Sequence, residues 1–327
     1  MKNGAAAIVG GLAIFGALVL RRVLKLRAAI NKLECLARNN RFHSSPSGFF
    51  RVAITGVSRG IGSACVDLLR AYPSIEIVSL GRSRSMNNGI FLDLTDEDSV
   101  MSAIGELGDK WYNNEKELVP GRDILVNNAG VFYAPSASMV WRVNLTSPSV
   151  MTHILSSKIQ AMKSNPRSLR FVQVTSRLEK RSLINSHNVS ECMDHGLDSR
   201  DGCFSPQDVY ADTKRVLVLL TAHMASLNEK RNDLTFVAVT PGMVNTDLGR
   251  NGVWRLVWWM SYPLRFILLR HPIEGAVSVL WAAFASPDQS GVYFGDSGEI
   301  LERIRETRDL EAGRRAMGKL LERFNVV

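Results

Sequence analysis

Cysteine and proline are scarce in this chain, and each scarcity excludes certain classes of protein. Only four of the 327 residues are cysteines, and their spacing matches neither a metal site nor a dense disulfide framework. Cys192 and Cys203 could pair in an oxidising compartment, but a reduced cytosolic setting is the simpler interpretation. With 11 prolines and 46% apolar residues, the composition excludes a disordered polymer. We expect a folded protein with a substantial core.

A recognition motif for nucleic acid is also missing, although the formal net charge is +9. The basic residues are scattered, apart from a cluster at positions 21–27 that has a better explanation. We therefore expect no nucleic-acid partner.

Charge is absent from residues 3–20, which are rich in Ala, Val, Ile, Leu and Gly. At a rise of ~1.5 Å per residue this run extends about 27 Å, close to the hydrocarbon thickness of a bilayer. Arg21, Arg22, Lys25 and Arg27 follow at once, and the positive-inside bias then places the main body in the cytosol. A transmembrane anchor is the prediction. A cleaved signal peptide fits less well, because the basic cluster follows the apolar run and no small-residue cleavage site closes it.

Four segments follow from these patterns. Residues 1–28 are interpreted as the membrane anchor with its basic flank, and residues 29–50 as a linker. Residues 51–300 are expected to form the globular domain. The charged amphipathic pattern of residues 301–327 predicts a C-terminal helix docked on that domain.

Short apolar runs alternate with longer amphipathic stretches from Arg51 onwards, which is typical of a parallel sheet covered by helices. The expected strands are 52–55, 75–80, 90–94, 124–126, 170–175, 235–239 and 291–294. The expected helices include 60–71, 210–228 and 272–285. Right-handed crossovers then predict an α/β fold with a doubly wound, Rossmann-like parallel sheet of about seven strands and an N-terminal transmembrane helix. Ligands should bind at the carboxyl ends of the strands.

A glycine-rich turn separates the first expected strand from the first expected helix. Gly56, Gly60 and Gly62 have the spacing G-x-x-x-G-x-G. Glycine permits the tight turn and lets the backbone approach phosphates, while the helix N-terminus presents free N–H groups. The sequence therefore predicts a dinucleotide pyrophosphate at this turn. The residues concerned are Gly56, Ser58, Arg59, Gly60, Ile61 and Gly62.

An acidic residue is missing at the end of the second strand, where an NAD site usually carries one. Arg82 and Arg84 occupy this region instead, and Arg59 lies in the glycine turn. Guanidinium groups suit a 2′-phosphate, so the sequence favours NADP(H) over NAD(H); arginines that are merely solvated are the alternative. Asp93, followed by Leu94, is placed to hydrogen-bond the adenine amino group.

Tyr210 and Lys214 lie one helical turn apart. A ketone that accepts hydride needs a proton donor beside its oxygen, and a tyrosine with its pKa near 10 is a reluctant acid–base at neutral pH. An ammonium on the same helix face favours the phenolate. Such pairs are common by chance in helices, where a half-buried tyrosine and a solvated lysine are the usual explanation, but the position relative to Gly56 and Ser176 raises the specificity of this pair.

The motifs together resemble the short-chain dehydrogenase/reductase family over roughly residues 50–300. They are TGVSRGIG at 55–62, NNAG at 127–130, Asn144, Ser176 in VTS, YADTK at 210–214 and PGMVNTDL at 241–248. The resemblance implies that Tyr210 is the general acid/base and that Ser176 holds the substrate oxygen. Lys214 would bind the nicotinamide ribose and lower the pKa of the phenol. Asn144 would position a water in a proton relay to Lys214.

The resemblance also implies how the cofactor is held. The NNAG segment would support the central sheet and line the adenosine ribose, and Val244 and Thr246 would meet the carboxamide end of the nicotinamide. The residues implied at the cofactor beyond the glycine turn are Arg82, Asp93, Leu94, Asn128, Ala129, Gly130, Tyr210, Lys214, Pro241, Gly242, Val244 and Thr246.

Within the family the chain is most similar to membrane-anchored retinol dehydrogenase-like members and their polyprenol-oxidising relatives. The similarity rests on the N-terminal anchor, on PGMVNTDLGR, and on HPIEGA followed by SGVYF. It implies an NADP(H)-dependent oxidoreductase for a lipophilic alcohol, aldehyde or ketone, such as a retinoid, polyprenoid, steroid or fatty aldehyde. The endoplasmic reticulum, with the domain facing the cytosol, is the expected location. Monomer and homodimer both stay open, and an anchored NADP-binding scaffold without turnover is the alternative function.

Two departures from the family pattern stand out. Only ten residues separate Arg82 from Asp93, which predicts that the helix between the second and third strands is missing or reduced to a turn. The polar insert 177–209 is longer than in compact members; its His187, Cys192, His195 and Cys203 are more simply a surface loop than a metal site. The aromatic stretch 253–269 predicts either a lipid-lined lid at a membrane interface or helices packed on the core.

Overall fold

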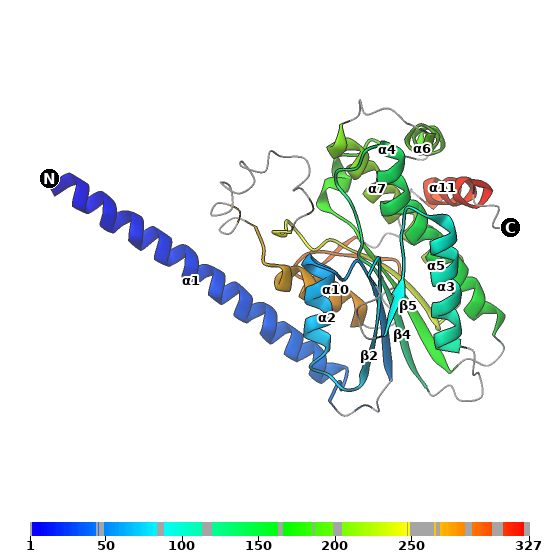
Figure 1. Ribbon diagram of the computed structural model, residues 1–327, viewed down its shortest axis with the longest axis horizontal. Coiled ribbons are helices and arrows are strands. Elements are labelled where there is room, and N and C mark those ends of the chain that lie inside the picture. The colour runs from blue at the N-terminus through cyan, green and yellow to red at the C-terminus, as the bar shows by residue number, and fades with distance from the viewer. Residues whose placement is uncertain are drawn as a thin grey trace.

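A parallel sheet with helices on both faces forms the body of the protein in the computed structural model (Figure 1). The structure describes residues 2–43, 45, 49–83, 88–112, 120–162, 166–185, 187–198, 205–246, 248, 265, 269–284, 290–302 and 310–323, with the side chains of the first helix described from residue 16.

The sheet has eight strands in the order β3-β2-β1-β4-β5-β6-β7-β8. All neighbours pair in parallel except β7 and β8. The doubly wound, Rossmann-like sheet predicted from the sequence is thereby confirmed. The strands are β1 Phe50–Thr55, β2 Ile75–Gly81, β3 Gly89–Phe91, β4 Gly121–Asn127, β5 Arg167–Val174, β6 Leu234–Val239, β7 Val292–Phe294 and β8 Ile300–Glu302.

Two helical layers cover the sheet (Figure 1). One apolar core joins α1, α2 and α10 to one face, and a second joins α3, α5, α7 and α11 to the other. The helices are α1 Lys2–Asn39, α2 Gly60–Leu69, α3 Glu97–Tyr112, α4 Ala137–Trp141, the π-helix η2 Arg142–Thr146, α5 Ser147–Ala161, the 3₁₀-helix η3 Arg177–Arg181, α6 Val189–Asp198, α7 Pro206–Leu227, α10 Pro272–Phe284 and α11 Leu310–Arg323.

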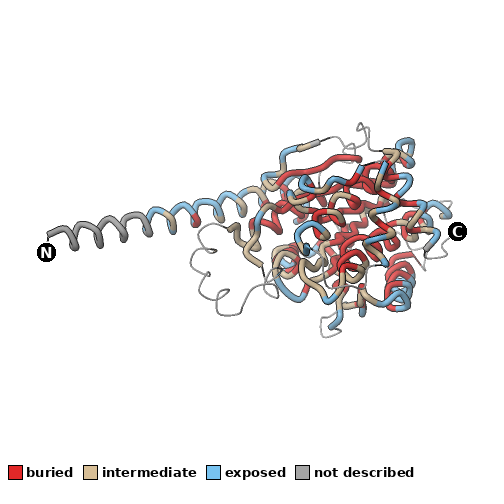
Figure 2. The backbone as a smooth tube through the Cα atoms, turned by 90° about the horizontal axis from the view of Figure 1, so that it is seen from above, coloured by how far each residue is buried: buried red, intermediate tan, exposed pale blue. Residues whose placement is uncertain are grey.

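The helix α1 is longer than the sequence predicts. Residues 29–39, assigned above to a linker, are helical, and Leu33, Leu36 and Ala37 are buried in the core shared with α10. Their spacing of three to four residues places them on one face, so docking on α10 stabilises a segment whose polar neighbours suggested a linker. The preceding part of α1 extends away from the sheet (Figures 1 and 2), although Arg22 donates to the Leu269 carbonyl at 3.0 Å.

Within the part of the chain that the structure describes, no helix combines the length and the apolar character required to cross a bilayer. The transmembrane anchor predicted over residues 3–20 is therefore not supported.

Three further expectations can be compared with the structure. The short β2–β3 connection brings Gly89 into register with Ser79, and no helix lies between these strands in the described residues, as predicted. The insert 177–209 is not irregular, because it contains η3 and α6, and Val189 and Met193 of α6 are buried. Part of the expected C-terminal helix is instead the strand β8. The Gly295–Gly298 turn reverses the chain there, with φ of +80° at Gly298.

A buried carboxylate fixes the strands at the edge where β1, β4 and β5 begin. The Asp123 side chain is fully buried and accepts hydrogen bonds from Arg51 Nε (2.7 Å), Arg51 Nη2 (2.6 Å), Arg167 Nε (2.8 Å) and the Tyr112 hydroxyl (2.8 Å). Burial, with the Asp123 charge second, raises the pKa of Tyr112. The ionic cluster holds these three strands together, and the opposite edge of the sheet is where their carboxyl ends converge.

Candidate active site

The candidate site lies where the strand order reverses, between β1 and β4. The chain runs outwards from β1 through β2 to β3, and then returns to β4 on the other side of β1. Neighbouring connections leave on opposite sides of the sheet at such a point, and the carboxyl ends of the strands then border a crevice. The glycine turn, the segment after β4, Ser176 and residues 241–246 each follow one of these strand ends, whereas Asn144 lies on η2 and Tyr210 and Lys214 lie on α7.

The turn between β1 and α2 has no room for a side chain at its glycine positions. Gly56 and Gly60 have φ of +71° and +64°. A Cβ atom on Gly56 would lie 2.8 Å from Ala129 Cα, and one on Gly62 would lie 2.6 Å from Asn128 Nδ2. The glycines are thus required by close backbone approach as well as by the left-handed conformation.

The first turn of α2 leaves its N–H groups available. The helix begins at Gly60, and among the described residues no side-chain cap is made by Arg59, its N-cap residue. Ser58 and Arg59 are exposed beside it. Uncapped N–H groups at the positive end of a helix, next to a cradle that any Cβ would fill, fit a dinucleotide pyrophosphate.

The segment after β4 braces this turn. Asn128 donates from Nδ2 to the Thr55 carbonyl (2.9 Å) and from its backbone N–H to Thr55 Oγ1 (3.0 Å). The Ala129 N–H donates to the same hydroxyl at 2.9 Å. The predicted residues Asn128, Ala129 and Gly130 therefore lie directly against the glycine turn.

Arg82 and Asp93 follow the ends of β2 and β3. Asp93 Oδ1 accepts hydrogen bonds from the Thr95 N–H (2.9 Å) and Oγ1 (2.7 Å). The Thr95 backbone bond is the largest cause of a lowered pKa at Asp93, and the charge of Arg82 adds to it. Arg82 is exposed, whereas Leu94 is buried. Arg84 falls outside the described residues.

Tyr210 and Ser176 meet in a buried position. Tyr210 starts the second turn of α7 and is 6% exposed; Ser176 follows β5 at the start of η3. Ser176 lies close enough to the Tyr210 hydroxyl to lower its pKa through hydrogen bonding. Ser176 Oγ also accepts from the Leu178 N–H at 3.3 Å, and the Phe132 ring lies 5.0 Å from the Tyr210 ring. Two hydroxyl groups from different elements thus converge on one point.

The expected lowering of the Tyr210 pKa is not found. Burial raises the pKa of Tyr210 to about 12, and the hydrogen bond with Ser176 only partly offsets this increase. The prediction that Lys214 lowers the pKa is wrong here because desolvation of a fully enclosed phenol outweighs the other influences. The phenol is therefore protonated throughout the physiological pH range.

Lys214 is fully enclosed as well. Its Nζ donates to the Val174 carbonyl at 2.9 Å and lies 5.7 Å from the centre of the Tyr210 ring. Burial lowers the pKa of Lys214 to about 8. A Cβ atom on Gly130 would lie 3.7 Å from Nζ, so the ammonium adjoins the segment that braces the glycine turn.

Asn144 lies in the π-helix η2, and its amide is held by the backbone of Val131. Oδ1 accepts from the Val131 N–H and Nδ2 donates to the Val131 carbonyl, both at 2.8 Å. Nδ2 also reaches Thr213 Oγ1 at 3.4 Å. Single π-helical turns often occur at functional sites. The relay through Asn144 to Lys214 stays a prediction, but the two side chains do border the same glycine, Gly130.

The segment after β6 closes the site over the glycine turn. A Cβ atom on Gly60 would lie 3.2 Å from Thr246 Cγ2. Val244 forms a parallel bridge with Arg270, and Gly242 has φ of +79°. The predicted residues 241–246 are thereby brought to α2, although about 180 residues separate the two segments along the chain.

Several residues at this site escaped the sequence analysis. Arg177, Arg270 and Asp296 form a charged network beside Gly242, and the Tyr293 hydroxyl donates to the Ser176 carbonyl at 3.5 Å. None of these four residues belongs to a local sequence motif. The only signals in the sequence were the strand pattern of β7 and the position of Arg177 next to Ser176.

Three of the residues considered for a metal site, His187, Cys192 and His195, lie in the part of the chain that the structure describes. Among the described residues no group of three or more His, Cys, Asp or Glu side chains is arranged to hold a metal ion. His195 lies on α6 with Glu191 as its neighbour at 3.9 Å, and both side chains are exposed. Cys203 and the aromatic residues 253–264 lie outside the described residues.

The buried Lys214 makes a testable prediction about stability. Its pKa of about 8 in the folded state lies below the ordinary value of 10.5, so between these values the unfolded chain binds a proton that the folded protein does not. Folding stability contributed by this group therefore rises with pH across that window, by about 3 kcal/mol in total. We expect the free energy of unfolding of the wild type, relative to Lys214→Met, to increase by this amount between pH 8 and pH 10.5 in urea titrations. A difference that does not vary with pH would contradict the buried ammonium.

Comparison with known proteins places these features in context. No protein-family model matches the chain. Human polyprenol dehydrogenase is 30% identical over 200 residues, covering 57% of this chain and 54% of the relative. Mouse retinol dehydrogenase 14 is 30% identical over 197 residues, covering 55% and 52%. A short-chain dehydrogenase/reductase from Phomopsis amygdali is 26% identical over 305 residues, covering 83% and 86%. The chain thus spans about half the length of the first two relatives.

Solved structures share the fold. The 3-alpha-hydroxysteroid dehydrogenase from Pseudomonas sp. B-0831, complexed with NADH, aligns with a TM-score of 0.55 at 20% identity, covering 75% of this chain and 95% of that one. The NADPH-bound carbonyl reductase from chicken fatty liver aligns with a TM-score of 0.52 at 18% identity, covering 77% and 98%. The predicted resemblance is therefore confirmed: in sequence and in fold this chain is similar to short-chain dehydrogenases/reductases, including enzymes named for polyprenol and retinol.

Proposed function

We propose that the protein is an NADP(H)-dependent oxidoreductase that interconverts a lipophilic alcohol with its aldehyde or ketone. The observation that carries this proposal is the burial of the Tyr210 phenol close to the Ser176 hydroxyl and beside the buried Lys214. A carbonyl oxygen placed at these two hydroxyls would accept a hydrogen bond from each of them. The glycine turn, whose adjoining helix N-terminus suits a pyrophosphate, is connected to the same group through Ala129 and Gly130.

Tyr210 is assigned the proton transfer and Ser176 the orientation of the substrate oxygen. With its pKa raised to about 12, the Tyr210 phenol carries its proton at neutral pH and is ready to donate it. When bound, the cofactor supplies the hydride in reduction or accepts it in oxidation. In reduction the carbonyl oxygen takes the phenolic proton and the carbonyl carbon takes the hydride, which yields the alcohol. The protonated phenol favours reduction as the working direction.

Lys214 is assigned to the nicotinamide ribose and to the charge that develops on Tyr210. Below a pH of about 8 its side chain is an ammonium enclosed with the phenol, and a cation in a poorly solvated site stabilises a nearby phenolate. The glycine turn is assigned to the pyrophosphate, Asn128–Gly130 to the adenosine ribose, and Val244 with Thr246 to the carboxamide.

The substitution Tyr210→Phe tests the proposed chemistry. Removing one hydroxyl should lower kcat about 10²- to 10⁴-fold, the usual contribution of a positioned acid, while NADPH affinity stays within about two-fold because the ring remains. Turnover is measured as NADPH consumption with retinal, polyprenal, steroid ketones and long-chain aldehydes, and binding by NADPH fluorescence. Tyr72→Phe, a buried tyrosine against Phe42, is the matched control. Unaltered turnover in Tyr210→Phe would rule out its catalytic role, and NADPH binding without turnover in the wild type would favour a scaffold.

NADP(H) is proposed over NAD(H) on the charge at the adenine end of the site. Arg82 is exposed at the end of β2, and Arg59 is exposed in the glycine turn. Asp93 bears a carboxylate near Arg82, but two of its hydrogen bonds come from Thr95 in its own turn. Guanidinium groups at this end favour a 2′-phosphate through charge-assisted hydrogen bonds.

Reversing the charge at Arg82 tests the cofactor preference. Arg82→Asp should weaken NADPH binding about 10- to 100-fold, the loss of a charged hydrogen bond, while NADH binding is retained or improved. Dissociation constants from fluorescence titration at fixed ionic strength give both values. Arg70→Asp makes the same charge change at an exposed position on the far end of α2 and serves as control. Equal losses for the two cofactors in Arg82→Asp would contradict the assignment.

A lipophilic substrate is proposed on the relatives and on the side chains around Tyr210. Two of the matched relatives are named for polyprenol and retinol. Near the candidate site, Phe132 packs against Tyr133 and Tyr210, with ring centres 5.0 Å apart in each pair. Met243 is 74% exposed directly after Gly242. Aromatic and thioether surface beside the paired hydroxyls suits an apolar carbonyl compound.

Contact with a membrane surface is proposed for the projecting part of α1. Val19, Leu20, Val23 and Leu24 are exposed there. Arg21, Lys25 and Arg27 lie among or shortly after them, and the helix carries no acidic residue before Glu34. Exposed aliphatic side chains flanked by basic ones favour an anionic lipid surface. The endoplasmic reticulum and the cytosolic orientation stay predictions from the sequence.

Vesicle binding tests this surface. The wild type should sediment with vesicles of mixed phosphatidylcholine and phosphatidylserine, and the pair Leu20→Glu and Leu24→Glu should reduce the bound fraction at least ten-fold, because each change places a charge on the apolar face. Leu227→Glu, at another exposed leucine, is the control. Equal binding of all three proteins would exclude α1 as the contact.

A further inference from the structure

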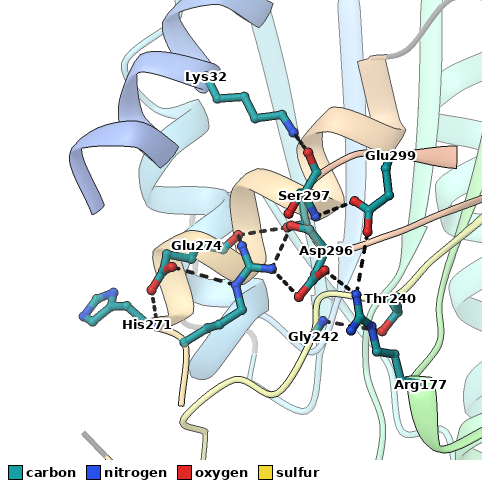
Figure 3. Close-up of polar contacts among 11 residues, drawn as sticks. Lys32, Arg177, Thr240, Gly242, His271, Glu274, Asp296, Ser297 and Glu299 are labelled. Atoms are coloured by element: carbon teal, nitrogen blue, oxygen red, sulfur yellow. Dashed lines mark hydrogen bonds and ion pairs between the residues drawn. The ribbon is translucent and has the colours of Figure 1, made fainter. Parts of the chain in front are cut away.

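The turn between β7 and β8 places one carboxylate between two arginines (Figure 3). Asp296 Oδ1 lies 2.7 Å from Arg177 Nη2, and Asp296 Oδ2 lies 3.0 Å from Arg270 Nη1. Arg270 Nη1 also donates to the Asp296 carbonyl at 2.7 Å. The two arginines come from different elements, since Arg177 begins η3 and Arg270 precedes α10.

The first arginine is joined to the hydroxyl side of the candidate site. Arg177 directly follows Ser176, whose carbonyl accepts the Tyr293 hydroxyl at 3.5 Å. Glu299 lies 3.6 Å from the same guanidinium nitrogen of Arg177. The peptide that carries Ser176 is therefore restrained from the β7–β8 side, and a shift of Arg177 would move it.

The second arginine holds the opposite side of the site, the segment Gly242–Thr246. The Arg270 N–H donates to the Met243 carbonyl at 2.8 Å, and the Asn245 N–H donates to the Arg270 carbonyl at 2.9 Å. A Cβ atom on Gly242 would lie 2.6 Å from Asp296 Oδ2 and 3.0 Å from Arg270 Cδ. The backbone of Gly242 is thus packed directly against the carboxylate of Asp296.

The turn that carries Asp296 is itself fixed. The Ser297 N–H donates to Glu299 Oε2 at 2.8 Å, and Ser297 also accepts a hydrogen bond from Lys32 of α1 through its carbonyl. Gly295 donates to the Glu299 carbonyl at 2.7 Å. A carboxylate on a turn that is itself held by hydrogen bonds can fix the positions of its partner side chains, whereas a carboxylate on an unrestrained loop cannot.

The exposure of the three side chains determines how strongly water screens the two ion pairs. The side chains of Asp296 and Arg270 are each 21% exposed, and that of Arg177 is 54% exposed. Water therefore screens the Arg270 contact less than the Arg177 contact. Both contacts are short and involve charged groups on both sides, which makes them stronger than neutral hydrogen bonds.

We propose that Asp296 is a positioning residue that fixes Ser176 and the Gly242–Thr246 segment relative to each other through Arg177 and Arg270. The proposal rests on the proposed function, because it is Ser176 that orients the substrate oxygen and the Gly242–Thr246 segment that meets the nicotinamide. Asp296 touches neither substrate nor cofactor in this scheme. It sets the distance between the residues that do.

A set of five variants tests the two arms separately. Arg177→Ala should lower kcat/KM about ten-fold and leave NADPH affinity unchanged, because it acts only through Ser176. Asp296→Asn should lower kcat/KM similarly and also weaken NADPH binding several-fold, because it acts on both sides. In the Ser176→Ala background, Arg177→Ala should cause no further loss. Arg177→Lys should recover part of the activity, because it restores a cation opposite Asp296.

Controls separate this proposal from the function on which it rests. Asp67→Asn removes a carboxylate from an exposed ion pair on α2 and should match the wild type, and equal thermal midpoints among the variants exclude simple unfolding. Losses in Arg177→Ala and Ser176→Ala that are independent of each other, or unchanged kinetics in Asp296→Asn, would overturn the positioning role while wild-type turnover keeps the function intact. A wild type that binds NADPH but turns over no carbonyl compound would instead refute the proposed function, and the positioning role with it.

Discussion

The burial of Tyr210 close to Ser176 and Lys214 is the constraint on which the rest of the site depends. It requires α7 to be docked on β5, so that a helix residue and a residue after a strand end lie close together. The same docking buries Lys214 against Val174. Burial raises the pKa of the tyrosine and lowers that of the lysine, so both side chains are kept in an environment unfavourable for their charged forms. Groups strained in this way are typical of functional sites rather than of stable cores.

A second constraint is the close packing of backbone around the glycine turn. Ala129 and Asn128 lie against Gly56 and Gly62 so closely that a methyl group would collide with them. Thr246 reaches the same turn from β6, and Asp296 then connects that segment to Ser176 through two arginines. The proposed phosphate, nicotinamide and substrate positions are therefore not independent. Each one is held by contacts that also hold its neighbour.

Much of this arrangement was predictable, and the errors have identifiable causes. Apolar runs and the glycine turn predicted the sheet and the position of α2. The end of α1 was missed because its buried residues, such as Leu33 and Leu36, are followed by a polar segment, and only docking on α10 stabilises them. The strand β8 was absorbed into an amphipathic pattern, because three residues are too few to show a period of two. The Tyr210 pKa was expected to fall because Lys214 lies one helical turn away. The depth to which the phenol is buried depends on the tertiary structure and cannot be predicted from that spacing.

The sequence by itself determined the fold class and the residues of the candidate site, because glycine spacing, strand periodicity and the four-residue step from Tyr210 to Lys214 are local properties. Tertiary structure alone decided their protonation and their partners. Desolvation depends on every element packed around a group, and the Arg177–Asp296–Arg270 network joins residues up to 119 positions apart. No local pattern can encode such a contact, since it exists only after the sheet has brought its strand ends together.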